Sequence, residues 1–168
     1  MNTLKDVIAY LMRHYPHPED LSKARLTKMV YLADWKSAID SGRQLTSIRW
    51  YFDNYGPYKP DVYTEVLANP ALFRVENTNN MYGDRKSILT LVDEQFVPSV
   101  TDDAKKLLSH VITETEMLSW TAFISLVYGT YPITVSPRYR NLNLVVMAKR
   151  YNQFNRDTQA DPATPPLH

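Results

Sequence analysis

The longest helical pattern of the chain runs from Ser22 to Gly42, and it limits the folds that the chain can adopt. Ser22 suits an N-cap, because its hydroxyl accepts a hydrogen bond from the first helical turn, and Gly42 suits the left-handed stop. Between them, apolar side chains recur on one face at Leu26, Met29, Val30 and Ala33. Tyr31 and Trp35 point roughly opposite to that face. Such a helix is either central to the core or carries a partner surface, and self-association through it stays open.

Shorter helices and a small β element are predicted around this helix. Helical spacing and end signals place them at about residues 3–14, 61–68, 101–118, after Ser119 as far as Gly129, and 143–154. Alternation in TSIRWYF predicts a strand near 47-53, and two β-rich runs around NTNNMYGD predict a hairpin over 72-92. The predicted fold class is mainly α (α+β), a compact bundle of about six helices with a small antiparallel β element.

Length and composition favour one soluble domain. Domains usually hold about 100 to 200 residues, so we expect a single domain over 1-155. Residues 156-168 are rich in proline and lack apolar periodicity, which predicts a disordered C-terminal tail. The chain has no cysteine and no apolar run near its start that would suit a signal peptide or a membrane span. We therefore expect a cytoplasmic protein that does not bind membranes.

The charge of the chain is balanced overall but uneven along it. A formal net charge of +1 lacks the positive bias that drives binding to a nucleic-acid backbone, so nucleic acid is an unlikely partner. Basic residues nevertheless recur from Arg138 to Arg156 with no acid before Asp157. This run is either a solvated basic face or a binding surface for an acidic partner.

No catalytic or cofactor site is predicted. Four glycines leave no phosphate-binding loop, and no serine or threonine sits in a nucleophile-elbow context. His14 and His17 straddle Pro16, so they cannot share a helical face as metal ligands. His110 is interpreted as a boundary residue of its helix. We expect no enzyme activity, no metal and no cofactor.

Asp34 lies next to the apolar face of the long helix. Burial of its carboxylate would require a partner, for which Arg25 and Arg49 are the candidates. A structural ion pair or hydrogen bond is favoured over catalysis.

An aromatic cluster follows the long helix, in the segment WYFDNYGPYKPDVY. One interpretation is burial around a turn set by Tyr55, Gly56 and Pro57. The other is a protein interface, because tyrosine and tryptophan are enriched at the energetic centres of interfaces. For the interface we predict partner contacts from four aromatic residues and two charged rim residues, namely Tyr31, Trp35, Tyr51 and Tyr58 with Arg49 and Lys59.

Three motifs carry a family resemblance: LTKMVYLAD at 26–34, SGRQLT at 41–46 and YGPYKPDVY at 55–63. In order and spacing they resemble the SocA-like Panacea domain, a family of bacterial antitoxin domains often encoded in phages, prophages and mobile elements. The residues that match the family's structural motif are Asp34, Gly42, Tyr55, Gly56, Pro57 and Tyr63.

The resemblance implies a mostly helical antitoxin of a toxin–antitoxin system that neutralises its cognate toxin by direct binding. Toxins paired with this family have many folds, including ones related to alarmone synthetases, so the toxin itself is not predicted. Two alternatives remain, a DNA-binding autoregulator of its own operon and a proteolytic adaptor for the toxin.

Overall fold

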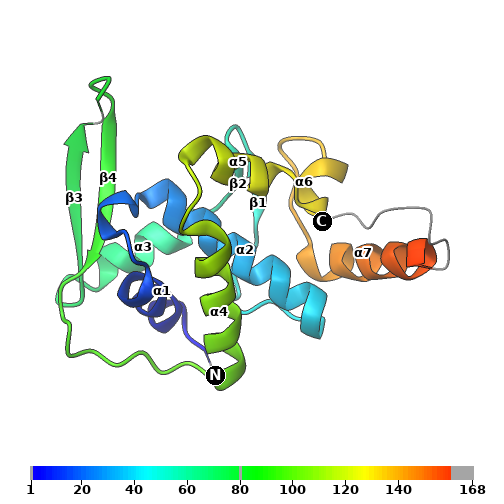
Figure 1. Cartoon of the computed structure of the whole chain (residues 1–168), viewed down its shortest axis with the longest axis horizontal. Helices are drawn as coiled ribbons and strands as arrows, with labels where there is room; N and C mark the ends of the chain where they lie inside the picture. The colour runs from blue at the N-terminus through cyan, green and yellow to red at the C-terminus, as the bar shows by residue number, and fades with distance from the viewer. Residues whose placement is uncertain (1, 80, 160–168) are drawn as a thin grey trace. The chain divides into compact units, whose positions relative to one another are not determined.

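A computed structural model describes residues 2–79 and 81–159 of the chain (Figure 1). The described part is mainly α-helical and holds two small antiparallel sheets of two strands each, as predicted. The chain divides into two units, and each unit is built from two separate segments. The first unit consists of Met1–Val30 and Pro60–Met117, and the second of Tyr31–Lys59 and Leu118–His168. A single domain over 1-155 stays a prediction.

Helix α2 (Lys23–Ser41) supplies residues to both units. Its ends follow the predicted signals, because the Ser22 hydroxyl accepts a hydrogen bond from the Arg25 amide and Gly42 adopts a φ of 75°. All of residues 25–35 are buried. The sequence left open whether this helix is central or carries a partner surface, and its burial on all sides favours the central position.

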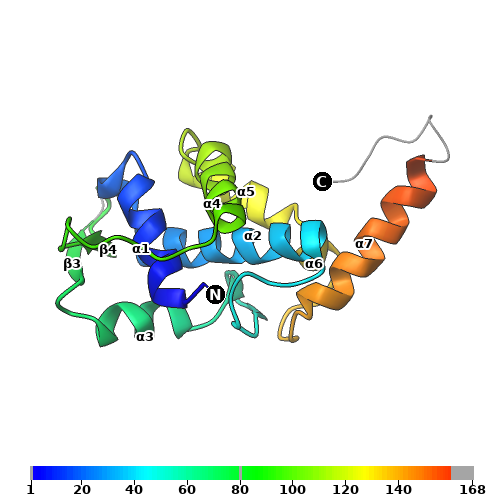
Figure 2. The ribbon, with the colours of Figure 1, turned by 90° about the horizontal axis from the view of Figure 1, so that it is seen from below.

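The first unit packs two helices and a hairpin around helix α1 (Leu4–His14). α1 contacts α3 (Asp61–Ala68), α4 (Asp102–Thr115) and strand β4 (Figures 1 and 2). Strands β3 (Phe73–Asn79) and β4 (Arg85–Leu91) pair antiparallel. Thr3 and Thr101 cap α1 and α4 through their side-chain oxygens. A 3₁₀ turn, η1 (Pro18–Asp20), contacts β4 and was not predicted.

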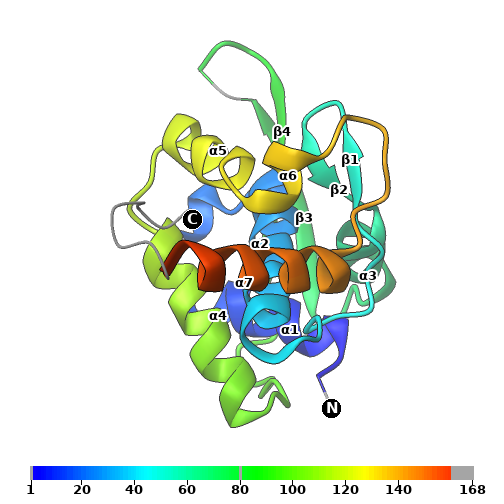
Figure 3. The same ribbon diagram turned by 90° about the vertical axis from the view of Figure 1, so that its right-hand side faces the viewer.

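The second unit holds a two-stranded ribbon and three helices. Strands β1 (Tyr51–Asp53) and β2 (Gly56–Tyr58) pair antiparallel. Helix α5 (Trp120–Tyr128), capped by Ser119, contacts α6 (Tyr131–Val135), and α6 lies beside α7 (Leu144–Gln159) (Figure 3).

Several predicted boundaries are wrong. The strand expected near 47-53 is regular only over β1, because residues before Trp50 bond to side chains and not to a neighbouring strand. α4 ends before the predicted limit at 118, and α6 was not predicted. α7 continues through residues 156–159, where we expected the tail to begin, and the rest of that tail lies outside the described residues.

Gly56 is the residue on which the β1–β2 turn depends, and its substitution provides a test of that turn. We expect Gly56→Ala to lower the free energy of unfolding by about 2 kcal/mol or more, because its φ is 100° and a Cβ would meet the Tyr128 ring at 3.3 Å. Gly42→Ala is the matched control: its φ is 75°, but nothing lies within 4 Å of the added Cβ. Urea unfolding of both variants distinguishes the stability lost to the Tyr128 contact from the stability lost to backbone strain. An equal loss in the two would show that the Tyr128 contact contributes nothing.

Candidate protein-binding surface

The second unit is organised by one buried carboxylate. Asp34 of α2 is fully buried and accepts hydrogen bonds from the amide and hydroxyl of Thr46, at 2.7 and 2.6 Å. It also accepts from the indole N–H of Trp50 at 2.8 Å and from the side-chain amide of Gln44 at 3.3 Å. All these donors are neutral, so the prediction of an arginine partner is wrong: Arg49 is exposed, and Arg25 donates to the Tyr15 hydroxyl at 3.4 Å.

The protonation of Asp34 reflects two opposing effects. Burial raises the pKa of its carboxyl to about 6, and the hydrogen bonds from Thr46 and Trp50 oppose that rise. A perturbed acid of this kind often marks a functional site. Here the carboxylate is buried and its oxygens are engaged by four donors, which confirms the predicted hydrogen bonding of Asp34.

The Asp34 bonds fix the chain that leads into β1, and β1 in turn holds a distant segment. The Trp50 carbonyl accepts from the Leu142 amide at 2.9 Å, and the Phe52 amide donates to the Arg140 carbonyl at 2.9 Å. The Tyr139 amide donates to the Phe52 carbonyl at 2.6 Å. Residues 139–142 therefore run along β1 as an added edge.

This pairing brings the aromatic turn together with the start of the basic run. Tyr55 is 82% exposed and Tyr139 is 58% exposed. Arg138 and Arg140 are exposed as well, and the Arg138 guanidinium lies 5.8 Å from the Phe52 ring centre. We name these four residues, Tyr55, Arg138, Tyr139 and Arg140, the Tyr–Arg surface. Tyrosine and arginine are the side chains that most often carry the binding energy of protein interfaces.

Tyr139 has an unusual backbone. Its φ is 65°, a left-handed value that costs about 1–2 kcal/mol for a residue with a Cβ. The conformation is held by the amide bond to Phe52 and by a hydrogen bond from the Tyr139 hydroxyl to the Asn54 side chain. Since the ring is mostly exposed, core packing does not explain a tyrosine at this position. Strain of this kind is concentrated at functional sites.

Two of the predicted partner contacts are not on the surface. Tyr31 is fully buried, its hydroxyl bonds to Thr130 at 2.8 Å, and its ring lies edge-on to Trp50. Burial raises the pKa of the Tyr31 hydroxyl well above its ordinary value. Trp35 is only 5% exposed. The prediction that both rings surface is wrong, because α2 is covered on both of its apolar sides.

The other predicted contacts are at least partly accessible. Tyr51 and Tyr58 face each other across the β1–β2 ribbon and are half-buried, as is Lys59, while Arg49 is exposed. Their role in binding stays a prediction. Among the motif residues, Gly56 and Pro57 are buried in β2 and Tyr55 lies at the turn. In the first unit, the Lys23 ammonium lies 4.2 Å from the centre of the Tyr63 ring.

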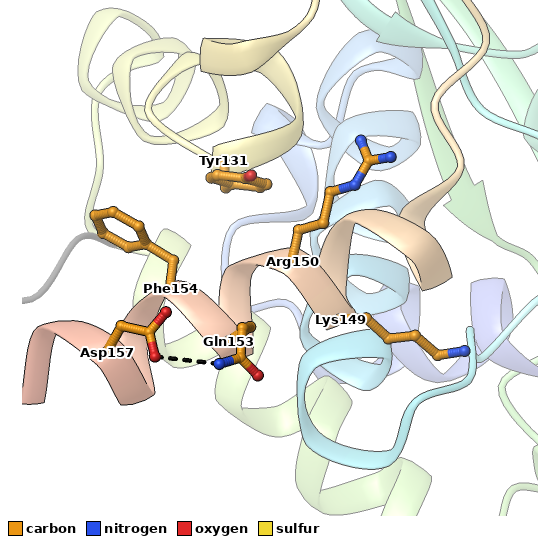
Figure 4. A pocket seen from close by; sticks show the side chains of 6 residues that line it. All are labelled: Tyr131, Lys149, Arg150, Gln153, Phe154 and Asp157. Carbon is orange, nitrogen blue, oxygen red and sulfur yellow. Dashed lines mark hydrogen bonds between the residues drawn. The ribbon is translucent and has the colours of Figure 1, made fainter.

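A second feature of this unit is an open hollow along α7, which the sequence did not indicate (Figure 4). It has a volume of about 500 Å³ and is lined by Tyr131 of α6 and five residues of α7, namely Lys149, Arg150, Gln153, Phe154 and Asp157. Trp35 stacks on Tyr131 with an angle of 12° between the rings, and Tyr151 packs against both. Trp35 thus supports a ring that lines the hollow.

Neither a metal-binding cluster nor a membrane-spanning helix is found in the part of the chain that the structure describes. Within residues 2–79 and 81–159, no group of three or more acidic or histidine side chains is arranged to hold a metal ion. In the same residues, every helix is too short or too polar to cross a lipid bilayer.

The residues missed from the sequence are Tyr139, Tyr131 and Phe154. The alternation Arg138-Tyr139-Arg140 was a usable signal, because an aromatic residue between two arginines resembles an interface centre. Tyr131 and Phe154 carried no such signal, since Tyr131 lies in a helix that was not predicted and Phe154 stands at the end of a predicted one.

Replacing Asp34 tests its role as the organising group. We expect Asp34→Asn to lower the free energy of unfolding by about 3 kcal/mol, because the new amide N–H₂ would face buried donors and leave them unsatisfied. Asp40→Asn is the control, since Asp40 is exposed and forms only the surface pair with Lys36. Chemical unfolding at pH 7 measures both. A loss no larger than that of the control would contradict the assignment.

The raised pKa of Asp34 also gives a pH dependence. The folded value of about 6 exceeds the unfolded value of 3.8, so folding takes up a proton between these pH values. The contribution of this group to stability is fully present below about pH 3.8 and is lost as the pH rises through 6. Relative to Asp34→Asn, the wild-type protein should therefore gain stability as the pH falls from about 7 to about 4. Parallel stability curves for the two proteins would show that Asp34 titrates normally.

Comparison with known proteins yields one family. Residues 26–132 match the family model described as antitoxin SocA-like, Panacea domain. No curated protein and no solved structure matches the chain. The match contains all of the long helix but its first turn, the Asp34 bonds and the whole aromatic turn, which are the elements that order the second unit. The chain belongs to the SocA-like Panacea antitoxin family.

Proposed function

We propose that this protein is an antitoxin that neutralises its cognate toxin by direct binding through the Tyr–Arg surface. The single observation that carries the location is Tyr139, an exposed ring on a strained backbone, buttressed by Phe52 and Asn54. A ring fixed in this way loses little conformational freedom when it binds, so more of its contact energy appears as affinity.

Charge supports an acidic partner. The described part of the second unit has nine basic side chains, Lys36, Arg43, Arg49, Lys59, Arg138, Arg140, Lys149, Arg150 and Arg156, against four acids, Asp34, Asp40, Asp53 and Asp157. In the first unit, acidic side chains outnumber basic ones. The net charge of the chain is near neutral because the basic second unit is offset by the acidic first unit. A negatively charged toxin surface would be attracted to the second unit.

We also propose a mode of inhibition without catalysis, in which the bound antitoxin occludes or distorts the toxin's active site. Asp34, the acid with the raised pKa, is enclosed by its own hydrogen-bond donors and does not reach solvent. An alarmone-synthetase-like toxin as partner, self-association, a cytoplasmic location and a role as a proteolytic adaptor stay open possibilities from the sequence.

The second candidate function is an autoregulator that binds operator DNA. It gains support from the same basic unit, since clustered arginine and lysine side chains release counterions from phosphates. The exposed Tyr55 and Tyr139 favour the protein partner, because a tyrosine ring adds desolvated contact area at a protein interface, whereas duplex backbone binding depends on cations.

Growth rescue tests the main proposal. The protein and the product of the neighbouring reading frame are expressed from separate inducible promoters in a heterologous bacterium, and complex formation is followed by co-purification. We expect rescue by the wild-type protein and loss of both rescue and co-purification for Tyr139→Ala. Met117→Ala is the control, because Met117 is an exposed apolar residue of the first unit and should leave both intact.

Stability measurements complete this experiment. Tyr139→Ala should change the free energy of unfolding by less than about 1 kcal/mol, because the ring is exposed. Loss of rescue by the control as well, or rescue by Tyr139→Ala, would contradict the assignment of the surface. A gel-shift titration with operator DNA at about 50 mM salt tests the second candidate, which requires a shift that weakens as salt rises.

A further inference from the structure

The hollow along α7 combines two accessible aromatic rings with two cations that form no ion pair in the described part of the chain. Phe154 is 42% exposed, and Tyr131 lies above the helix with its ring directed over the hollow (Figure 4). Lys149 and Arg150 are exposed at one end. Neither cation forms an ion pair within residues 2–79 and 81–159.

At the opposite end of the hollow, the polar side chains already form hydrogen bonds with each other. The Gln153 side-chain amide donates to Asp157 at 3.1 Å, and its oxygen accepts from Arg156 at 2.6 Å. The carboxylate of Asp157 is therefore held by a neutral donor, and Gln153 has its donor and its acceptor engaged. The two cations and the two rings are the groups of the lining that favour an acidic ligand with an apolar side chain.

The aromatic wall is rigid. Tyr131 stacks on buried Trp35, whose ring also contacts Tyr151 edge-on at 5.6 Å. Three rings in mutual contact resist collapse of the hollow when it is empty. A preformed apolar wall favours binding, because no reorganisation opposes it.

We propose that this hollow binds an acidic peptide segment that places one aromatic or large aliphatic side chain against Tyr131 and Phe154 and its carboxylates on Lys149 and Arg150. Charge complementarity identifies the occupant, since the lining carries two cations, Lys149 and Arg150, against one acid, Asp157, and the acid lies at the opposite end of the hollow. The open shape suits an extended chain better than an enclosed small molecule. The site is separate from the Tyr–Arg surface and does not require that the partner be a toxin.

Single-stranded nucleic acid also combines negative charge with flat apolar groups. The lining disfavours it, because the two cations lie together at one end of the hollow, whereas a single strand needs a positive groove that follows its backbone. Nucleic-acid binding is therefore an outcome that would overturn the proposal.

Calorimetry and amide chemical-shift mapping on the full chain test the site with three blocked hexapeptides. The probe is Glu-Asp-Glu-Phe-Asp-Glu, and the comparisons are the same peptide with serine for phenylalanine and the basic peptide Lys-Arg-Lys-Phe-Arg-Lys. We expect the probe to bind about tenfold or more tightly than either comparison, with shifts centred on Tyr131, Arg150 and Phe154. No binding, or equal binding of the serine peptide, would overturn the proposal.

Variants distinguish binding at this site from attraction by the overall charge of the unit. Arg150→Glu and Phe154→Ala should each weaken binding of the probe about tenfold, without a change in melting temperature beyond a few degrees, because both side chains are exposed. Arg43→Glu makes the same change of charge at an exposed position of the same unit outside the hollow and should weaken binding by less than about threefold. Equal losses for the two charge reversals, or displacement of the probe by a ten-nucleotide thymidine strand, would show that no peptide site exists.

Discussion

The hydrogen bonds to Asp34 are the interactions on which the second unit depends. A buried carboxylate is costly unless its oxygens are engaged, and here four neutral donors from residues 44–50 converge on it. These bonds order the segment that follows α2. The regular structure of that segment consists of two short strands, β1 and β2. The pairing of Trp50 and Phe52 with residues 139–142, and therefore the position of Tyr139, follows from that order.

Aromatic contacts supply the second level of organisation. Tyr31 and Trp35, one helical turn apart on α2, lead to two different sets of rings: Tyr31 meets Trp50, and Trp35 meets Tyr131 and Tyr151. Tyr31 therefore backs the chain that leads to the Tyr–Arg surface, and Trp35 backs the hollow along α7. These two of the six residues predicted to touch a partner are instead buried, and they support residues that are exposed.

Much of the fold could be predicted, and the failures share a physical reason. Caps, glycine stops and apolar periodicity are local, so Ser22, Gly42, Thr101 and Ser119 marked their helices correctly. Five-residue α6 was missed because it is too short to show a period. The sequence indicated that a buried Asp34 needs a partner. Its neutral donors could not be identified from the sequence, because they depend on the path of residues 44–50. Tyr139 was missed because its exposure and left-handed φ depend on pairing with Phe52 of β1 and on a hydrogen bond to Asn54, 85 residues away.

That long separation along the chain has a consequence for the timing of synthesis. The aromatic turn leaves the ribosome well before residues 138–142, and at roughly 5–20 residues per second the delay is about 4–17 s. During this interval β1 cannot pair with residues 139–142, and the Asn54 side chain lacks the hydrogen bond from Tyr139. The Tyr–Arg surface therefore forms only after residues 138–142 have emerged. If this surface binds the toxin as we propose, a newly started molecule cannot neutralise the toxin until then, which favours a reserve of folded protein over synthesis on demand.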